Sequence, residues 1–121
     1  MVKALFDTNI LIDYLSGAEE ARAELARYRQ RAIGVVTWME VMVGAHADAE
    51  HVTRAFLRGF DLIGLDEKIA DRAVSLRRTH RIKLPDAVIW AAAQTTGMLL
   101  VTRNTKDFPA GDPGVRHPYN L

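Results

Sequence analysis

Short apolar runs alternate with longer segments of mixed polarity along this chain. The apolar runs, several of them rich in β-branched residues, predict buried strands over 2–6, 32–36, 60–65 and 98–101. In the segments between them, apolar residues recur three or four positions apart, as they do on one face of a helix. These segments predict helices over 10–15, 18–30, 38–46, 48–58, 66–81 and 85–95.

Glycine and proline mark several ends of these elements. Gly17 and Gly97 are expected to end helices, because glycine tolerates the left-handed cap conformation, and Pro85 suits the first position of a helix. The chain from residue 102 onward is expected to be loop, with a brief edge strand near Val115. Short strands that alternate with helices imply a mainly parallel sheet covered by helices on both faces. We therefore predict a single α/β domain over residues 1–121, without internal repeats or linkers.

Composition places the chain among ordinary globular proteins. It has 121 residues, of which 49% are hydrophobic and 26% charged, and a net charge of +1 that does not by itself indicate a nucleic-acid binder. The absence of cysteine excludes a disulfide framework, a thiolate metal site and a cysteine nucleophile. The longest apolar run, 87–93, is far shorter than the ~20 residues that cross a bilayer, and no signal-peptide pattern is present. We expect a cytoplasmic protein without a membrane segment.

Four acidic residues follow predicted strands or lie at the starts of predicted helices: Asp7, Glu40, Asp86 and Asp107. Ligands of parallel α/β sheets bind at this edge, beyond the carboxyl ends of the strands. Each acid also has a structural interpretation. Asp7 could cap a helix, Glu40 lies at capping-box spacing from Thr37, Asp86 falls in a first helical turn, and Asp107 is in a turn-rich loop.

The local setting of two of these acids favours a functional role. Glu40 is the only charge within 35–43, and Asp86 is the only charge between Lys83 and Arg103, in front of a helix that is apolar all round. Such a helix is buried, and buried charges are rare unless they are paired or bind a metal. Two carboxylates ~4 Å apart repel each other by about 4 kcal/mol at an effective dielectric constant of 20. A cluster of four acids therefore predicts a cation among them.

The available ligand types indicate which cation this would be. Oxygen-only ligands favour Mg²⁺ or Mn²⁺, whereas zinc is disfavoured because cysteine is absent and the four histidines lack metal-ligand spacing. Neither serine has a nucleophile setting, and no glycine-rich phosphate loop is present. These observations indicate metal-assisted chemistry on a phosphate-bearing substrate.

Four segments, 6–11, 37–41, 84–93 and 100–108, together resemble the motifs of PIN-domain ribonucleases, specifically the VapC-type toxins of bacterial and archaeal toxin–antitoxin pairs. The segments occur in the family's order and span nearly the whole chain. The resemblance implies a single PIN-like domain with about five parallel strands and a Mg²⁺- or Mn²⁺-dependent endoribonuclease activity, with one or two ions per site. It also implies an RNA substrate, a homodimer, and inhibition by a small cognate antitoxin protein.

The resemblance also assigns roles to residues. It maps the family's acids onto Asp7, Glu40, Asp86 and Asp107 as catalytic residues and metal ligands, with Asp7 and Asp86 on the principal metal. Glu40 and Asp107 would complete or orient a second metal and the attacking water. In-line attack would leave a 5′-phosphate and a 3′-hydroxyl. The supporting polar residues of the matched motifs are Thr8, Asn9, Thr102 and Asn104.

Arginine dominates the basic residues, since 12 of the 16 are arginine, a side chain that binds phosphate bidentately and stacks on bases. Two basic residues flank the predicted site in its own loop, and a second group precedes Asp86 and could line an RNA approach. The second group could equally be cations at a helix C-terminus. The candidate RNA-binding residues are Arg103 and Lys106 in the loop, and Arg77, Arg78 and Arg81 before Asp86.

Two other classes of protein fit parts of the pattern. A phosphoacceptor receiver domain has similar size, α/β architecture and an acidic Mg²⁺ site, but it pairs two acids after its first strand, where this chain has Thr8 and Asn9. A catalytically silent binding module would use the acids only as helix caps. Phosphodonor labelling distinguishes the first from a nuclease, and a metal-dependent gain in thermal stability distinguishes the second.

Overall fold

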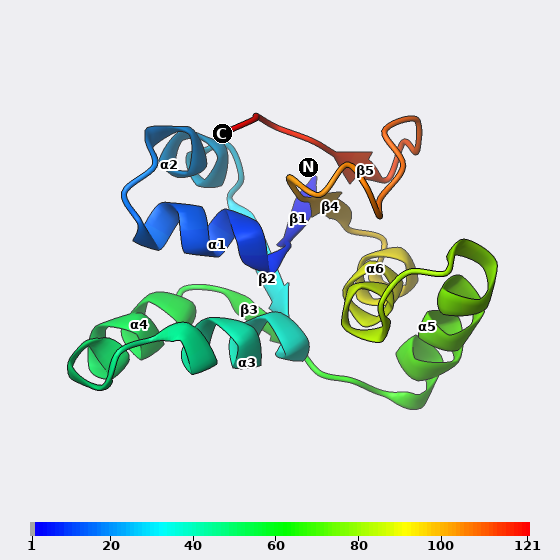
Figure 1. Ribbon diagram of the computed structural model, residues 1–121, viewed down its shortest axis with the longest axis horizontal. Coiled ribbons are helices and arrows are strands. Elements are labelled where there is room, and N and C mark those ends of the chain that lie inside the picture. The colour runs from blue at the N-terminus through cyan, green and yellow to red at the C-terminus, as the bar shows by residue number, and fades with distance from the viewer. Residues whose placement is uncertain (1) are drawn as a thin grey trace.

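A five-stranded parallel sheet forms the centre of the computed structural model, which describes residues 2–121 (Figure 1). In the sheet the strands lie in the order β3-β2-β1-β4-β5, and every neighbouring pair is parallel. The prediction of a mainly parallel sheet with about five strands is therefore confirmed. The strands are β1 (Lys3–Phe6), β2 (Gln30–Gly34), β3 (Asp61–Ile63), β4 (Leu99–Val101) and β5 (Val115–Arg116).

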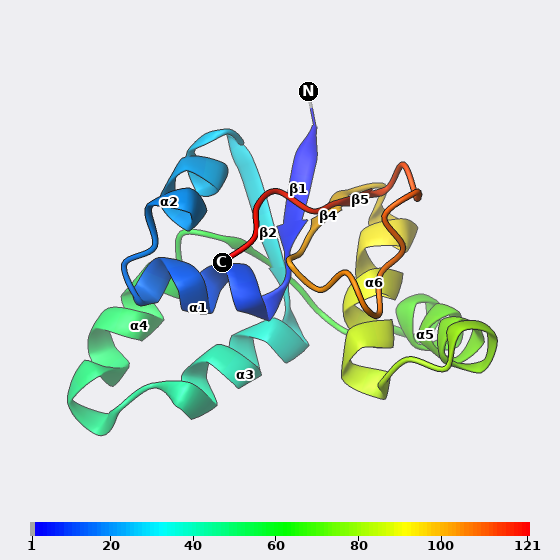
Figure 2. The ribbon, with the colours of Figure 1, turned by 45° about the horizontal axis from the view of Figure 1, so that its top comes forward.

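Helices cover both faces of the sheet, as predicted (Figure 2). The first four helices pack on one face together with Ala4 and Phe6 of β1, and the last two pack on the other with Leu5. This division follows from the pleat of the strand, which turns successive side chains to opposite faces. The helices are α1 (Thr8–Leu15), α2 (Glu19–Ala26), α3 (Val35–Gly44), α4 (Glu50–Leu57), α5 (Glu67–His80) and α6 (Leu84–Thr96), with a 3₁₀ turn at Ala47–Ala49.

Helix α6 is the most buried helix, as its uniformly apolar sequence predicts. It lies between the sheet and α5, and its buried residues include Ile89 and Trp90. The Trp90 ring packs edge-on against Phe108 of the loop after β4, with 5.6 Å between ring centroids. The position of α6 is therefore fixed on several sides, which fixes the first helical turn that carries Asp86. In the described part of the chain, none of these helices has the length and apolar character to cross a membrane.

The region between β2 and α3 differs from the prediction. The strand ends at Gly34, and α3 begins at Val35 instead of at residue 38. The β-branched Val35 and Val36 favour a strand by composition, but here they form the first turn of a helix, and Val36 packs against the core around α6. The structural alternative for Glu40, a capping box with Thr37, is therefore wrong: Gly34 is the N-cap, and Thr37 is a buried residue inside the helix.

Smaller differences occur at other element ends. Helix α2 ends at Ala26 instead of residue 30, because β2 already begins at Gln30, which pairs with Lys3 of β1. The helix predicted over 48–58 divides into the 3₁₀ turn and α4. Each difference moves a boundary by a few residues and leaves the type of element unchanged.

The C-terminal end of α6 provides a test of local backbone geometry. Gly97 has φ +69°, and an alanine Cβ there would meet no atom within 4 Å, so only backbone strain opposes it. Gly97→Ala is expected to lower the free energy of unfolding by roughly 1–2 kcal/mol. Gly44→Ala, at the end of α3 and equally unobstructed, should leave it unchanged or raise it by up to about 1 kcal/mol. Urea denaturation measures both; equal losses in the two variants would contradict this explanation.

Candidate functional site

The four predicted acids gather beyond the carboxyl ends of β1 and β4. Asp7 directly follows β1 and caps α1, Glu40 comes from α3, Asp86 from the first turn of α6, and Asp107 from the loop after β4. Their proximity is evident in the electrostatics of Asp86, whose pKa is raised by burial and also by repulsion from the charges of all three others. The structure thus brings together side chains that are up to 100 residues apart in the sequence.

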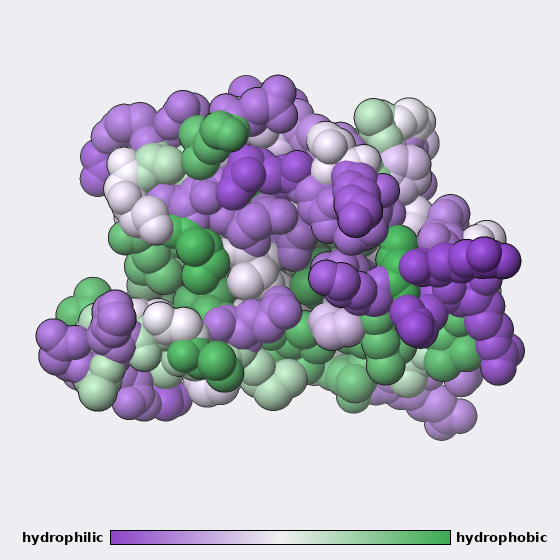
Figure 3. Space-filling view, viewed as in Figure 1, coloured by the Kyte–Doolittle hydropathy of each residue, from purple (hydrophilic) through white to green (hydrophobic). Residues whose placement is uncertain are grey.

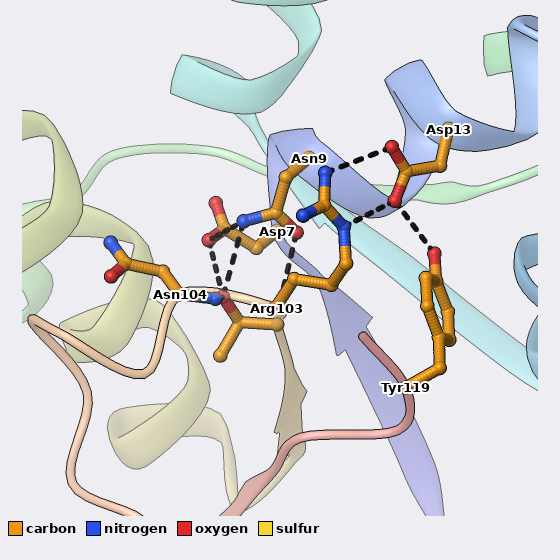
Figure 4. Close-up of polar contacts among 7 residues, drawn as sticks. Asp7, Asn9, Asp13, Arg103, Asn104 and Tyr119 are labelled. Atoms are coloured by element: carbon orange, nitrogen blue, oxygen red, sulfur yellow. Dashed lines mark hydrogen bonds and ion pairs between the residues drawn. The ribbon is translucent and has the colours of Figure 1, made fainter. Parts of the chain in front are cut away.

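Asp7 is the most buried of the four, with 4% of its surface exposed. Its Oδ1 accepts a hydrogen bond from the Thr8 backbone N–H (2.7 Å). Its Oδ2 accepts from the Thr102 hydroxyl (2.7 Å) and from the Asn9 amide (3.2 Å) (Figure 4). Burial raises the pKa of Asp7 above its usual value, although these three hydrogen bonds act in the opposite direction. Asp7 is therefore a desolvated carboxylate held in one orientation.

Glu40 is an exposed residue whose carboxylate is held from α1. The Thr8 hydroxyl donates to Glu40 Oε1 at 2.6 Å, and it lies 3.1 Å from the hydroxyl of the buried Thr37. Asp7 and Thr8 are adjacent in the sequence, so the start of α1 contacts two of the four acids. Thr8 acts as a link between α1 and α3, a role that spacing alone does not reveal.

Asp107 is organised by its own loop. The Asn104 side-chain amide donates to Asp107 Oδ2 (3.0 Å), while its oxygen accepts from the backbone N–H groups of Lys106 and Asp107. The Asn104 backbone N–H in turn donates to the hydroxyl of Thr102, which is fully buried. Thr102 therefore contacts both the segment that carries Asp107 and the carboxylate of Asp7.

Asp86 is the one acid of the four whose side chain has no hydrogen-bond donor among residues 2–121. Burial together with the charges of Asp7, Asp107 and Glu40 raises its pKa to about 6, and Lys83 opposes this only in part. A carboxylate in such surroundings is stabilised either by a proton or by a cation.

The potential metal ligands at this site fit a hard divalent cation by their chemistry. They are carboxylate, hydroxyl and amide groups, without sulfur or imidazole, and oxygen ligands of this kind are those that Mg²⁺ and Mn²⁺ prefer. Within residues 2–121, no three acidic or histidine side chains are close enough to hold an ion as they are placed.

Two further buried carboxylates lie outside the cluster of four acids, and the sequence interpretation missed both. Asp13 of α1 accepts two hydrogen bonds from the Arg103 guanidinium, and Glu24 of α2 accepts two from Arg116 of β5. Asp13 is the only charge within 8–18, a setting like those of Glu40 and Asp86, and this signal could have identified it. Glu24 lies in a charge-rich helix and carries no comparable signal.

The candidate RNA-binding residues have different surroundings. Two donors of the Arg103 guanidinium are engaged by Asp13, and the Arg77 guanidinium donates to the backbone carbonyl of Ile82, at the loop that joins α5 to α6. Arg78, Arg81 and Lys106 are exposed. Figure 3 shows a strongly hydrophilic surface over α5.

Comparison with known proteins identifies relatives. The sequence profile of the PIN domain matches residues 4–111. A solved toxin–antitoxin complex from Klebsiella pneumoniae contains a chain with 52% identity and a TM-score of 0.94, covering 98% of this chain and 100% of its own length. No curated protein sequence matches the chain.

More distant structures share the fold. FitAcB from Neisseria gonorrhoeae matches with 24% identity and a TM-score of 0.80, over 98% of this chain and 99% of that one. A DNA-bound VapBC from Salmonella typhimurium matches with 23% identity and a TM-score of 0.79, over 96% of each chain. At these identities the likeness establishes the architecture alone.

The raised pKa of Asp86 predicts a pH-dependent stability in the metal-free protein. Because the pKa is about 6 in the folded state against an ordinary 3.8, the folded state holds this proton more firmly, and stability is lost as the pH rises through 6. With a chelator present, Asp86→Asn is expected to raise the free energy of unfolding by about 1 kcal/mol at about pH 7.5 and to have little effect at about pH 4. Asp71→Asn, on the exposed side of α5, is the matched control. A gain of equal size at both pH values, measured by urea denaturation, would contradict the assignment.

Proposed function

The chain belongs to the PIN-domain family, and from this premise we propose that it is a divalent-metal-dependent endoribonuclease and the toxin of a toxin–antitoxin pair. The observation that carries the proposal is the convergence of Asp7, Glu40, Asp86 and Asp107 at one edge of the sheet, where Asp86 has no donor from residues 2–121. The 52% identity to a chain of the Klebsiella pneumoniae toxin–antitoxin complex supports the biological context.

In this proposal Asp7 and Asp86 hold the principal Mg²⁺ or Mn²⁺ ion, and Glu40 and Asp107 complete the site or hold a second ion. When bound, such an ion supplies a positive charge that activates water and offsets the charge of the phosphate. The burial of Asp7 supports this assignment, as does the combination of burial and repulsion from the other three acids at Asp86. These effects raise the pKa of both carboxylates, and a bound cation offsets them.

The protein's own residues orient the acids. The Thr102 hydroxyl and the Asn9 amide donate to one oxygen of Asp7, which leaves that carboxylate a single orientation. The Thr8 hydroxyl holds Glu40, and the Asn104 amide holds Asp107. Hydrogen bonds of this kind, made to groups that bind a metal, fix their direction.

We assign hydrolysis of the RNA phosphodiester to this site. Water attacks phosphorus in line with the departing 3′ oxygen, so that the products carry a 5′-phosphate and a 3′-hydroxyl. Glu40 and Asp107 are the acids that would orient the attacking water, because they are less buried than Asp7. Ionised Asp86 is needed to bind a cation, so cation binding by the metal-free protein should strengthen as the pH rises through about 6.

A phosphoacceptor receiver domain is not favoured by the family match. Its acid pair after the first strand is also missing, since Thr8 and Asn9 occupy those positions and both serve as donors to neighbouring acids.

The charge distribution supports an RNA substrate. Two divalent cations at the site would compensate its four acids, and the 16 basic residues would then face only 11 other acidic ones. Of the candidate RNA-contacting residues, Arg78, Arg81 and Lys106 are exposed and free to bind phosphate.

Protein partners are the remaining part of the proposal. We expect a small cognate antitoxin and a second copy of this chain to bind, in the cytoplasm. Exposed apolar side chains on α1, α3 and α4 are consistent with partner-covered surface. They include Ile12, Leu15, Met39, Val43 and Val52.

Loss of either principal acid tests the metal site. Asp7→Asn and Asp86→Asn should each lower the rate of RNA cleavage by more than about 100-fold at millimolar Mn²⁺ or Mg²⁺, since changes to supporting groups alone cost up to that amount. Cleavage of total RNA with mapped cut sites gives the rate, and circular dichroism confirms that the variants are folded. Asp71→Asn should cleave like the wild type. Undiminished cleavage by either site variant would refute the assignment, and a wild type that never cleaves would indicate a silent binding module.

Variants of Arg77 and Arg78, which are neighbours on α5, should show which arginine binds RNA and which stabilises the fold. In an Asp86→Asn background, Arg78→Gln is expected to weaken RNA binding and to reduce the slope of log affinity against log salt by about 1. Arg77→Gln removes the donor to the Ile82 carbonyl and should lower the free energy of unfolding by about 1 kcal/mol. Fluorescence anisotropy at several salt concentrations measures the first effect, and urea denaturation the second. An unchanged slope in Arg78→Gln would assign that residue to the helix terminus or to a protein partner.

A further inference from the structure

We propose that Asp13, Arg103 and Tyr119 form a positioning unit that holds the Asp7 carboxylate in its orientation through the Arg103 backbone and the Asn9 amide. None of the three unit residues contacts Asp7 directly in the described structure. The catalytic importance of Asp7 rests on the proposed function, whereas the hydrogen-bond connection can be tested without it.

The Asp13 carboxylate accepts three hydrogen bonds at the point where α1 faces the loop after β4 (Figure 4). Arg103 donates from Nε to Oδ2 (2.5 Å) and from Nη2 to Oδ1 (3.0 Å), and the Tyr119 hydroxyl donates to Oδ2 (2.9 Å). Only 9% of the Asp13 side chain is exposed. A bidentate pair with a buried carboxylate fixes direction as well as distance, so it restrains where residue 103 lies relative to α1.

The backbone of the same arginine makes the connection to the site. The Arg103 N–H donates to Asn9 Oδ1 (3.1 Å), and the Asn9 Nδ2 donates to Asp7 Oδ2 (3.2 Å). An amide side chain with one donor and one acceptor engaged can no longer flip. Thr102, the preceding residue, donates its hydroxyl to the same oxygen of Asp7 (2.7 Å). Two of the donors to Asp7 therefore depend on where residues 102 and 103 lie.

The protein contains a second unit of similar composition, whose link toward the site is the backbone hydrogen bond from the Thr102 N–H to the Arg116 carbonyl (3.0 Å), where β4 pairs with β5. Glu24 accepts from Arg116 Nε (2.7 Å) and Nη2 (3.0 Å) and from the Tyr28 hydroxyl (2.8 Å). Glu24 is as buried as Asp7, at 4% exposed. Neither Glu24, Arg116 nor Tyr28 makes a described side-chain hydrogen bond to the four acids. Loss of either ion pair should affect stability similarly, but only loss of the Asp13 unit should affect the Arg103 backbone N–H and the Asn9 amide that it contacts.

The experiment compares Asp13→Asn with Glu24→Gln in the full chain, each a near-isosteric removal of the charge. In ¹⁵N-labelled metal-free protein, Asp13→Asn should shift the side-chain amide resonances of Asn9 and accelerate hydrogen exchange of the Arg103 backbone amide by about tenfold or more. Glu24→Gln should leave both signals as in the wild type. In RNA cleavage at a temperature where both variants are folded, Asp13→Asn should lower kcat by about 10–100-fold with little change in KM, and Glu24→Gln should change neither.

Tyr119→Phe provides a milder variant that keeps the ion pair and removes one donor to Asp13. It should shift the same Asn9 resonances by a smaller amount, and it serves as the test if Asp13→Asn does not fold. Unchanged Asn9 and Arg103 signals in Asp13→Asn or Tyr119→Phe, or equal changes in Glu24→Gln, would overturn the positioning role. If these signals change as expected but the wild type cleaves no RNA, the positioning role is supported and the proposed function fails.

Discussion

Burial of a carboxylate costs several kcal/mol unless hydrogen-bond donors or a cation replace the lost water, and three carboxylates of this protein are more than nine-tenths buried. Asp7, Asp13 and Glu24 each accept three hydrogen bonds. For Asp7, Asp13 and Glu24 in turn, a donor comes from 95, 90 and 92 residues away, in the last fifth of this sequence. Because the buried carboxylates need these donors, the loop after β4 and strand β5 are held against helices α1 and α2. The proposed site lies where these segments meet.

The fold was predictable from sequence because its elements have distinct hydrophobic periods. Helix α6, apolar on every side, was expected to be buried and is enclosed between the sheet and α5. The error at 35–37 has a physical cause, since Val35 and Val36 resemble a strand locally but lie in the first turn of α3. Val36 packs against the core around α6, and this tertiary contact favours the helical conformation of the segment. A window of local sequence does not contain that information.

The site was predictable to the extent that its residues stand out locally. Glu40 and Asp86 were found because each is an isolated charge in an apolar segment, and Asp7 because it follows a buried strand. The position of Arg103 in the loop of the site predicts an RNA contact, whereas its pairing with Asp13, 90 residues away, cannot be read from spacing. Glu24 resembles an ordinary surface acid, because it lies in a charge-rich helix whose dipole favours acids near its start. In the structure it is buried and accepts hydrogen bonds from Arg116 and Tyr28.

The central position of β1 has a consequence for synthesis of the protein. Its neighbour β4, the Thr102 hydroxyl and the Tyr119 hydroxyl are synthesised long after Asp7 and Asp13 have left the ribosome. Because chains emerge N-terminus first, a growing chain holds these acids without their donors and leaves one edge of β1 unpaired. The carboxylate cluster therefore cannot assemble until the chain through Tyr119 has emerged, and a shorter ribosome-bound fragment would lack it.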